Sequence, residues 1–187
     1  MGKIRKTDSK NKIENAFIKL LTTKDYDQIS ISNLTKTANV NRGTFYLNYL
    51  NKEDLLQSIE KDFFTGLIKI LSADNKTKTG YFSNEAIKNI ALYLQDNYHL
   101  IHALLISDLS AEIDQELIKI LKKSFLEKNA NLVSPAIPTP YAVEVIFSSI
   151  ISIFSLWIKR GMKEDIPQLL KIIRQYSELS PKEILTV

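Results

Sequence analysis

A short stretch near the N-terminus carries side chains whose types and spacing suit contact with a polyanion. Arg42 can neutralise a phosphate or donate a pair of hydrogen bonds to guanine, and Thr44 can hydrogen-bond a base or touch a thymine methyl group. Tyr46 and Asn48 can donate to phosphate oxygens. Lys52 stands at the start of a long predicted helix, where the cation and the backbone amides both favour an anion. This combination predicts binding to duplex DNA.

Gly43 supports the same prediction, because glycine inside a short helix costs about 1 kcal/mol relative to alanine. A surface that must lie close to DNA would explain the missing side chain. The stretch also has a purely structural interpretation, in which Phe45 and Tyr49 pack in a core, Gly43 is tolerated and Lys52 is solvated. Both interpretations stay open at this point.

A helix-turn-helix would position these side chains. The hydrophobic period predicts one helix over residues 31–38, capped by Ser30 or Ser32, and a second over residues 42–49. The turn between them contains Asn39, and asparagine tolerates left-handed backbone. In such a unit the second helix lies in the major groove of DNA, with its N-terminal residues at the base edges.

The rest of the chain also follows a helical period, so the predicted fold class is all-α. We expect a three-helix DNA-binding domain over residues 1–52, in which residues 1–8 are a basic arm. A helical domain for dimerisation and effector binding would follow over residues 53–187. The other predicted helices cover residues 9–22, 52–71, 83–97, 98–107, 110–129, 142–160 and 166–178, with a polar loop over 72–80 and a gap that contains Pro135, Pro138 and Pro140.

The charge is distributed unevenly along the chain. Residues 1–52 contain ten Lys or Arg and four Asp or Glu, a net charge of +6, whereas the remaining residues have a net charge of −2. Such a separation indicates a polyanion-binding module joined to a different one. The alternative is a solvated basic N-terminus in a lysine-rich chain, since 21 of the 25 basic residues are lysine.

The composition argues against several other classes of protein. Without cysteine there is no disulfide framework, zinc finger, iron–sulfur ligation or cysteine nucleophile. His99 and His102 have a spacing that can share a metal ion, but no further His or Cys joins them, so we expect no metal site and no cofactor. No phosphate-binding loop or nucleophile elbow occurs, and Glu112, Asp114 and Glu116 are spaced as a solvated helix face. We therefore expect a protein that is not an enzyme.

We expect neither a targeting signal nor a membrane span. No apolar stretch follows the basic start. The most apolar run, residues 142–158, contains Glu144 and four serines, whereas a membrane helix needs about 20 residues with few polar ones. A buried helix in a cytoplasmic protein is the resulting expectation.

Residues 10 to 56 resemble the DNA-binding domain of tetracycline-repressor-type (TetR/AcrR) regulators. The resemblance lies in alanine, turn and valine at 38–40, the run Arg42-Gly43-Thr44-Phe45-Tyr46, an aromatic residue three positions further on, and Lys-Glu-x-Leu at 52–55. The family usually has glycine at the position of Asn39 and often histidine at that of Asn48. The resemblance implies that the DNA-contacting residues are Ser30, Ser32, Arg42, Gly43, Thr44, Tyr46, Asn48, Tyr49 and Lys52.

The C-terminal part more loosely resembles one subgroup of that family. Its helix over 142–158 is apolar nearly all round and must be covered on every side, so we expect a homodimer. The residues expected at the dimer interface are Val143, Phe147, Ile150, Ile151, Phe154, Leu169 and Ile173. The resemblance also implies an effector pocket, whose aromatic candidates are Tyr93, Tyr98, His102, Phe125 and Trp157; plain core packing is the alternative for each.

The sequence therefore predicts a homodimeric transcriptional regulator. We expect a repressor that binds a pseudo-palindromic operator on double-stranded DNA and is released by a small-molecule effector. The alternative is a regulator that is controlled by, or co-activates with, a protein partner. An α-helical enzyme is a third class, which no catalytic motif in the sequence supports.

Overall fold

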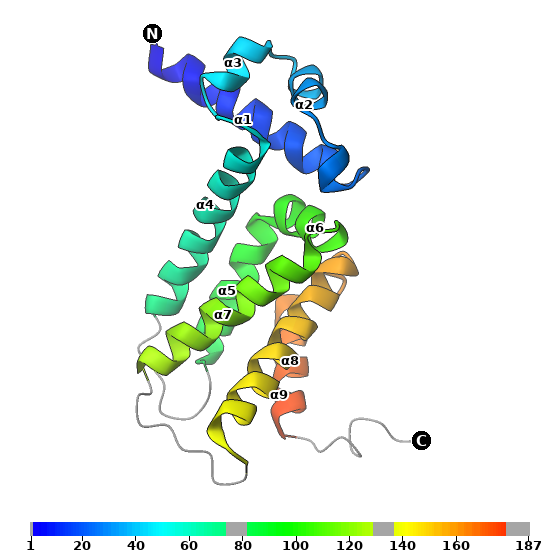
Figure 1. The fold of residues 1–187 in the computed structure, drawn as a ribbon. Helices are drawn as coiled ribbons and strands as arrows, with labels where there is room; N and C mark the ends of the chain where they lie inside the picture. Colours follow the sequence, from blue (N-terminus) through cyan, green and yellow to red (C-terminus); the bar gives the residue numbers. More distant parts are fainter. Residues whose placement is uncertain (1, 74–81, 129–136, 179–187) are drawn as a thin grey trace. The chain divides into compact units, whose positions relative to one another are not determined.

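In the computed structural model, which describes residues 2–73, 82–128 and 137–178, every regular element is a helix. This confirms the all-α prediction (Figure 1). The elements are α1 (Gly2–Leu21), a 3₁₀ helix (Tyr26–Gln28), α2 (Ile31–Ala38), α3 (Arg42–Tyr46), α4 (Lys52–Ala73), α5 (Asn84–Asp96), α6 (Tyr98–Ile106), α7 (Ser110–Lys128), α8 (Thr139–Lys159) and α9 (Ile166–Glu178). Most of the expected polar loop and the gap with Pro135 lie outside the described residues.

The contacts divide the chain into two units. Unit 1 consists of residues 1–66 and 99–113, and unit 2 of residues 67–98 and 114–187. The helices α4 and α7 therefore each run from one unit into the other.

Unit 1 is built around the packing of α1 against α2 and α3, which Figure 1 draws in blue to cyan. One face of α1 supplies Ile13 and Phe17, both completely buried. Leu34 of α2, Phe45 of α3 and Leu55 of α4 are also completely buried. Removing these apolar side chains from water stabilises the three-helix arrangement and fixes the position of α3.

The boundaries of α2 agree with the prediction, but those of α1 and α3 differ. The first helix begins at Gly2, so residues 2–8 of the expected basic arm are helical. The third helix ends at Tyr46 instead of continuing to residue 49. The side-chain Nδ2 of Asn48 donates to the Thr44 carbonyl over 2.7 Å, and the Asn48 backbone N–H donates to Phe45 instead. The side chain thus takes the acceptor that the next helical hydrogen bond would need.

Unit 2 is a bundle in which α9 packs against α5 and α8. The helix α8 ends in a left-handed turn, with φ of +77° at Gly161 and a hydrogen bond of 2.8 Å from the Met162 N–H to the Trp157 carbonyl. Among the described residues, α8 is also long and apolar enough, by length and composition, to cross a membrane. Core helices of soluble proteins share this composition, and the inward face of α8 is buried in the bundle.

Candidate nucleic-acid interface

Short-range hydrogen bonds hold α2, the turn and α3 in a helix-turn-helix. Ser30 caps α2 in a reciprocal capping box, in which its Oγ accepts from the Asn33 N–H and its own N–H donates to the Asn33 side chain. Asn39 ends α2 in left-handed backbone, with φ of 53° and ψ of 49°. Asn41 then caps α3, because its Oδ1 accepts from the Thr44 N–H over 2.7 Å. These contacts confirm the predicted cap and the predicted turn.

The outward surface of this unit carries most of the predicted DNA-contacting residues. The side chains of Ser30, Ser32, Arg42 and Tyr46 are exposed. Thr44 and Asn48 are half-buried, and each already makes a local hydrogen bond: the Thr44 hydroxyl donates to Asn41 and the Asn48 amide to Thr44. The structure therefore brings these residues together around α3.

Gly43 lies exposed at the start of α3. A Cβ atom at Gly43 would meet the Oδ1 of Asn41 at 3.3 Å, which is tighter than an ordinary van der Waals contact, and this oxygen is the one that caps α3. The cap therefore disfavours a side chain at this position, and a close approach from outside would disfavour it as well.

Tyr49 is not available for DNA, which corrects the prediction that it contacts the operator. Its side chain is buried, and its hydroxyl donates to Glu14 of α1 over 2.7 Å. The physical reason is the turn after α3, which points the Tyr49 ring inward against Phe45. Tyr49 instead belongs to the structural interpretation that the sequence left open.

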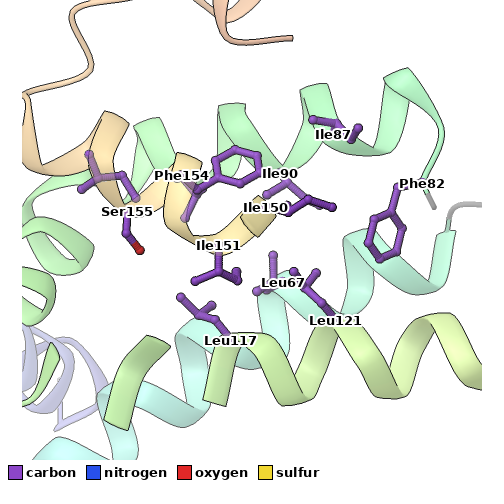
Figure 2. Close-up of a pocket in the computed structure, with 12 residues that line it drawn as sticks. Leu67, Phe82, Ile87, Ile90, Leu117, Leu121, Ile150, Ile151, Phe154 and Ser155 are labelled. Atoms are coloured by element: carbon purple, nitrogen blue, oxygen red, sulfur yellow. The ribbon is translucent and has the colours of Figure 1, made fainter. Parts of the chain in front are cut away.

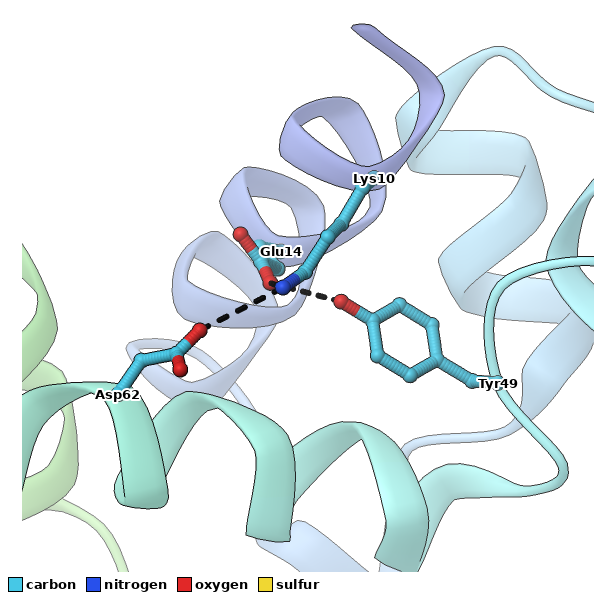
Figure 3. A network of polar contacts seen from close by, with 4 residues as sticks. All are labelled: Lys10, Glu14, Tyr49 and Asp62. Atoms are coloured by element: carbon cyan, nitrogen blue, oxygen red, sulfur yellow. Dashed lines mark hydrogen bonds and ion pairs between the residues drawn. The ribbon is translucent and has the colours of Figure 1, made fainter. Parts of the chain in front are cut away.

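Figure 3 shows the polar network that Tyr49 joins. Lys10 lies 3.5 Å from Glu14 and 3.4 Å from Asp62 of α4, so the network connects α1, the turn and α4. Burial lowers the pKa of the Lys10 ammonium, but Glu14 and Asp62 outweigh it and raise the pKa overall. Burial and the hydrogen bond to Glu14 raise the pKa of the Tyr49 phenol. The network fixes the end of the turn against its supporting helices.

The Lys52 side chain at the start of α4 is held by contacts with Tyr26. Its ammonium donates to the Tyr26 carbonyl over 2.8 Å and lies 3.9 Å from the centre of the Tyr26 ring. The backbone N–H of Tyr26 in turn donates to both carboxylate oxygens of Asp108, over 3.0 and 3.2 Å. The half-buried ammonium is therefore partly immobilised, contrary to the solvated side chain of the structural interpretation.

No pattern in the sequence pointed to Tyr26 or Asp108. Asp108 lies in the connection between α6 and α7, 82 residues from Tyr26. Burial and the nearby carboxylates of Glu53 and Glu60 raise the pKa of Tyr26 to about 12. Only a three-dimensional structure brings these groups together.

The seven residues predicted for a dimer interface lie in the core of unit 2, where they offer a partner chain almost no surface. Each of them is 7% exposed or less, and the chain's own core covers them. The exposed apolar side chains of the last two helices belong to different positions: Tyr141, Val145 and Leu156 of α8 and Ile172 of α9. The helical period located the apolar helix but did not separate its inward face from its outward face.

Unit 2 contains an apolar cavity of about 30 Å³, measured as the volume that the centre of a water-sized sphere can occupy (Figure 2). Its one polar lining residue is Ser155, whose hydroxyl donates to Asp114 over 2.7 Å. The lining residues are Leu67, Phe82, Ile87, Ile90, Leu94, Leu117, Leu121, Ile150, Ile151, Phe154, Ser155 and Ile158.

None of the five predicted effector-binding residues lines this cavity. Phe125 packs against Phe82, which lines the cavity; the centres of the two rings are 6.4 Å apart. Trp157 is buried, and its indole N–H donates to the Glu164 carbonyl. Tyr93, Tyr98 and His102 are half-buried elsewhere. The prediction favoured aromatic side chains, whereas this cavity is lined mainly by branched aliphatic ones.

Two family models match the chain. A model of the tetR family of bacterial regulatory proteins matches residues 15–59. A model of a transcriptional regulator C-terminal region matches residues 83–179, just over half of the chain. The first match covers the helix-turn-helix, and the second covers α5 to α9.

Individual proteins agree with these matches. An uncharacterised HTH-type transcriptional regulator of Haemophilus influenzae is 33% identical over 94 residues, 49% of this chain, and the chain spans about half (50%) of its length. The fatty acid metabolism regulator protein of Bacillus subtilis is 26% identical over 170 residues, covering 84% of this chain and 87% of that protein. A solved TetR transcriptional regulator from Streptococcus agalactiae is 27% identical, with a TM-score of 0.64 over 92% of this chain and 94% of its own.

Proposed function

The chain belongs to the tetR family of bacterial regulatory proteins, and we propose that it is a homodimeric repressor released from its operator by an apolar small molecule. The observation that carries the proposal is the exposed α3, held by α2 and the Asn39 turn, with Arg42 and Tyr46 on its surface. Such a helix fits the major groove of duplex DNA.

Arg42, Thr44 and Gly43 are the proposed groups at the base edges. Arg42 offers a guanidinium for guanine or phosphate, and Thr44 keeps part of its side chain accessible beside it. Gly43 lets the groove approach the backbone of α3. Ser30, Ser32, Tyr46 and Asn48 are proposed to contact phosphates, which position the protein without reading sequence.

Lys52 is the proposed cation for a further phosphate. An ammonium has three N–H donors, and one of them is used on the Tyr26 carbonyl. The contact with Tyr26 limits the rotation of the Lys52 side chain before DNA binds. Less conformational entropy is then lost when Lys52 contacts a phosphate. We therefore assign Lys52 a pre-organised phosphate contact.

The outward faces of α8 and α9 are the proposed dimer interface. Tyr141, Val145 and Leu156 are all more than half exposed, and Ile172 lies on the neighbouring helix. The small, exposed Ser152 lies one turn before Leu156 on α8 and leaves space for a second helix to approach. A two-fold pair of chains would present two copies of α3 to a palindrome.

The apolar cavity of unit 2 is the proposed effector site. Its aliphatic lining suits a hydrocarbon chain, and its volume of about 30 Å³ requires the walls to move when such a chain enters. Leu67 of α4 and Leu117 of α7 line it, and both helices continue into unit 1. The Bacillus subtilis relative is named as a regulator of fatty acid metabolism, which supports an apolar ligand class. A ligand that favours one conformation lowers DNA affinity by its differential affinity for the two states.

Selection from random-sequence duplexes tests the proposal. We expect a palindrome to be enriched, and Thr44→Ala to lose about 1–3 kcal/mol of affinity on that palindrome only. Lys52→Ala should weaken binding to all sequences and reduce the salt dependence by about one ion per protomer. Lys88→Ala, which removes an exposed lysine of α5, is the matched control. Selection of no common sequence would refute the operator-binding proposal.

A further inference from the structure

Leu47 and Leu50 stand fully out of the core beside α3. They are 76% and 79% exposed, the highest values among the large apolar side chains that the structure describes. Tyr46 next to them is 55% exposed. Exposed apolar side chains that are neighbours on a surface indicate a site of contact with another molecule.

The position of Leu47 places it with the groups proposed to face DNA. Its backbone N–H donates to the Gly43 carbonyl over 3.0 Å, so Leu47 lies one helical turn after Gly43, on the same face. Gly43 itself is exposed and carries no side chain. Leu47 is thus the next side chain along the face where a groove can approach the backbone most closely.

The chemistry of leucine restricts what it can recognise there. A leucine side chain neither donates nor accepts a hydrogen bond, so it offers nothing to the polar edges of guanine, cytosine or adenine. The 5-methyl group of thymine is the one apolar feature that base pairs display in the major groove. Among base edges, Leu47 is therefore suited to thymine.

We propose that Leu47 is a specificity-determining residue that reads a thymine methyl group in each operator half-site. The inference rests on the proposed function, because it needs α3 to enter the major groove. DNA is the expected occupant because the leucine continues the surface that begins with the Arg42 guanidinium, in the part of the chain whose net charge is +6.

The expected effect follows from the burial of one methyl group. Such burial contributes about 0.8 kcal/mol, which corresponds to about a fourfold change in affinity. A two-fold operator contains the contact twice, so replacing both thymines changes the affinity by about 15-fold.

The experiment uses the full-length protein and the palindrome obtained by selection. Each thymidine is replaced in turn, symmetrically, by deoxyuridine, which removes the methyl group and keeps every hydrogen bond. We expect one symmetric pair of replacements to weaken wild-type binding by about 15-fold. Leu47→Ala should lose a similar factor on the thymidine duplex and lose nothing more on that deoxyuridine duplex, because both changes remove the same contact.

Leu50→Ala is the matched control, since it truncates an equally exposed leucine whose backbone N–H donates to Asp54 of α4 and not to the α3 turn that holds Leu47. Its loss, if any, should be equal on both duplexes. If every deoxyuridine duplex binds like the parent, or if Leu47→Ala loses the same factor on both duplexes, the assignment of Leu47 is overturned. Leu47→Ala with unchanged affinity on all DNA also overturns it and points to a protein contact. Failure to select any palindrome is a different result, which overturns the proposed function and this inference with it.

Discussion

Replacing Leu156 by aspartate tests whether the outward face of α8 forms the dimer. Leu156 is 57% exposed in the single chain, and burying a whole leucine contributes about 1.5–3 kcal/mol. Covering roughly the exposed half contributes about 1–1.5 kcal/mol, and a two-fold interface contains the residue twice. The loss is then about 2–3 kcal/mol, or roughly a 30- to 160-fold weaker dimer, before the cost of burying a carboxylate.

Sedimentation velocity over a concentration series measures this change directly. Leu156→Asp should shift the monomer–dimer midpoint to higher concentration by at least that factor, with the helical content and the thermal midpoint of the monomer preserved. Leu126→Asp is the control, because Leu126 is an exposed leucine on a different helix, α7. By contrast, Ile151→Asp should unfold unit 2, since Ile151 is buried in its core. A Leu156→Asp dimer as tight as the wild type would refute the proposed interface.

Further predictions follow from unit 1. Tyr49→Phe should lower the free energy of unfolding by about 1–2 kcal/mol in chemical denaturation, because Glu14 loses a donor at 2.7 Å. The raised pKa values of Tyr26 and Tyr49 mean that the folded chain keeps protons that the unfolded chain loses near pH 10, so stability is fully present below pH 10 and falls as pH rises towards about 12. Asp108→Ala removes the acceptor of the Tyr26 N–H, so Tyr26 should hold Lys52 less firmly and DNA binding should weaken several-fold. This loss of affinity should vanish in a Lys52→Ala background.

Each of these three predictions has a control and a result that would contradict it. Tyr46→Phe alters an exposed ring outside the proposed dimer interface and should leave stability unchanged when DNA is absent. Equal stability of Tyr49→Phe and wild type would show that the hydrogen bond to Glu14 does not stabilise unit 1. Denaturation midpoints that stay constant from pH 9 to 11 would contradict the linkage. Glu112→Ala removes a nearby exposed carboxylate of α7 and should not affect binding. An equal loss for Asp108→Ala with and without Lys52 would show that Asp108 acts by another route.

Features set by neighbouring residues could be predicted from the sequence. The Ser30 cap and the left-handed Asn39 depend on hydrogen bonds and steric preferences within a few positions, so local side-chain types determine them. The length of α3 also depends on a local contact, but it is decided by a competition between the side chain and the backbone of Asn48 for one carbonyl. The helical period alone does not reveal which donor wins.

Features that depend on distant packing could not be predicted. The contacts that hold Lys52 require Tyr26 and Asp108, which the chain brings together across 82 residues. Similarly, the composition of α8 shows that the helix is apolar all round, but which face the bundle covers depends on α5, α7 and α9. The aromatic effector candidates do not line the cavity of unit 2, because burial of an aromatic ring does not indicate whether it borders a cavity.

The stoichiometry and affinity on a full palindrome, compared with an isolated half-site, test the central claim that two copies of α3 read one two-fold operator. We expect two chains per full duplex and binding that is far tighter than on the half-site. The half-site centres should be separated by a whole number of helical turns, each about 34–36 Å. One chain per duplex, with the same affinity for both DNAs, would contradict it.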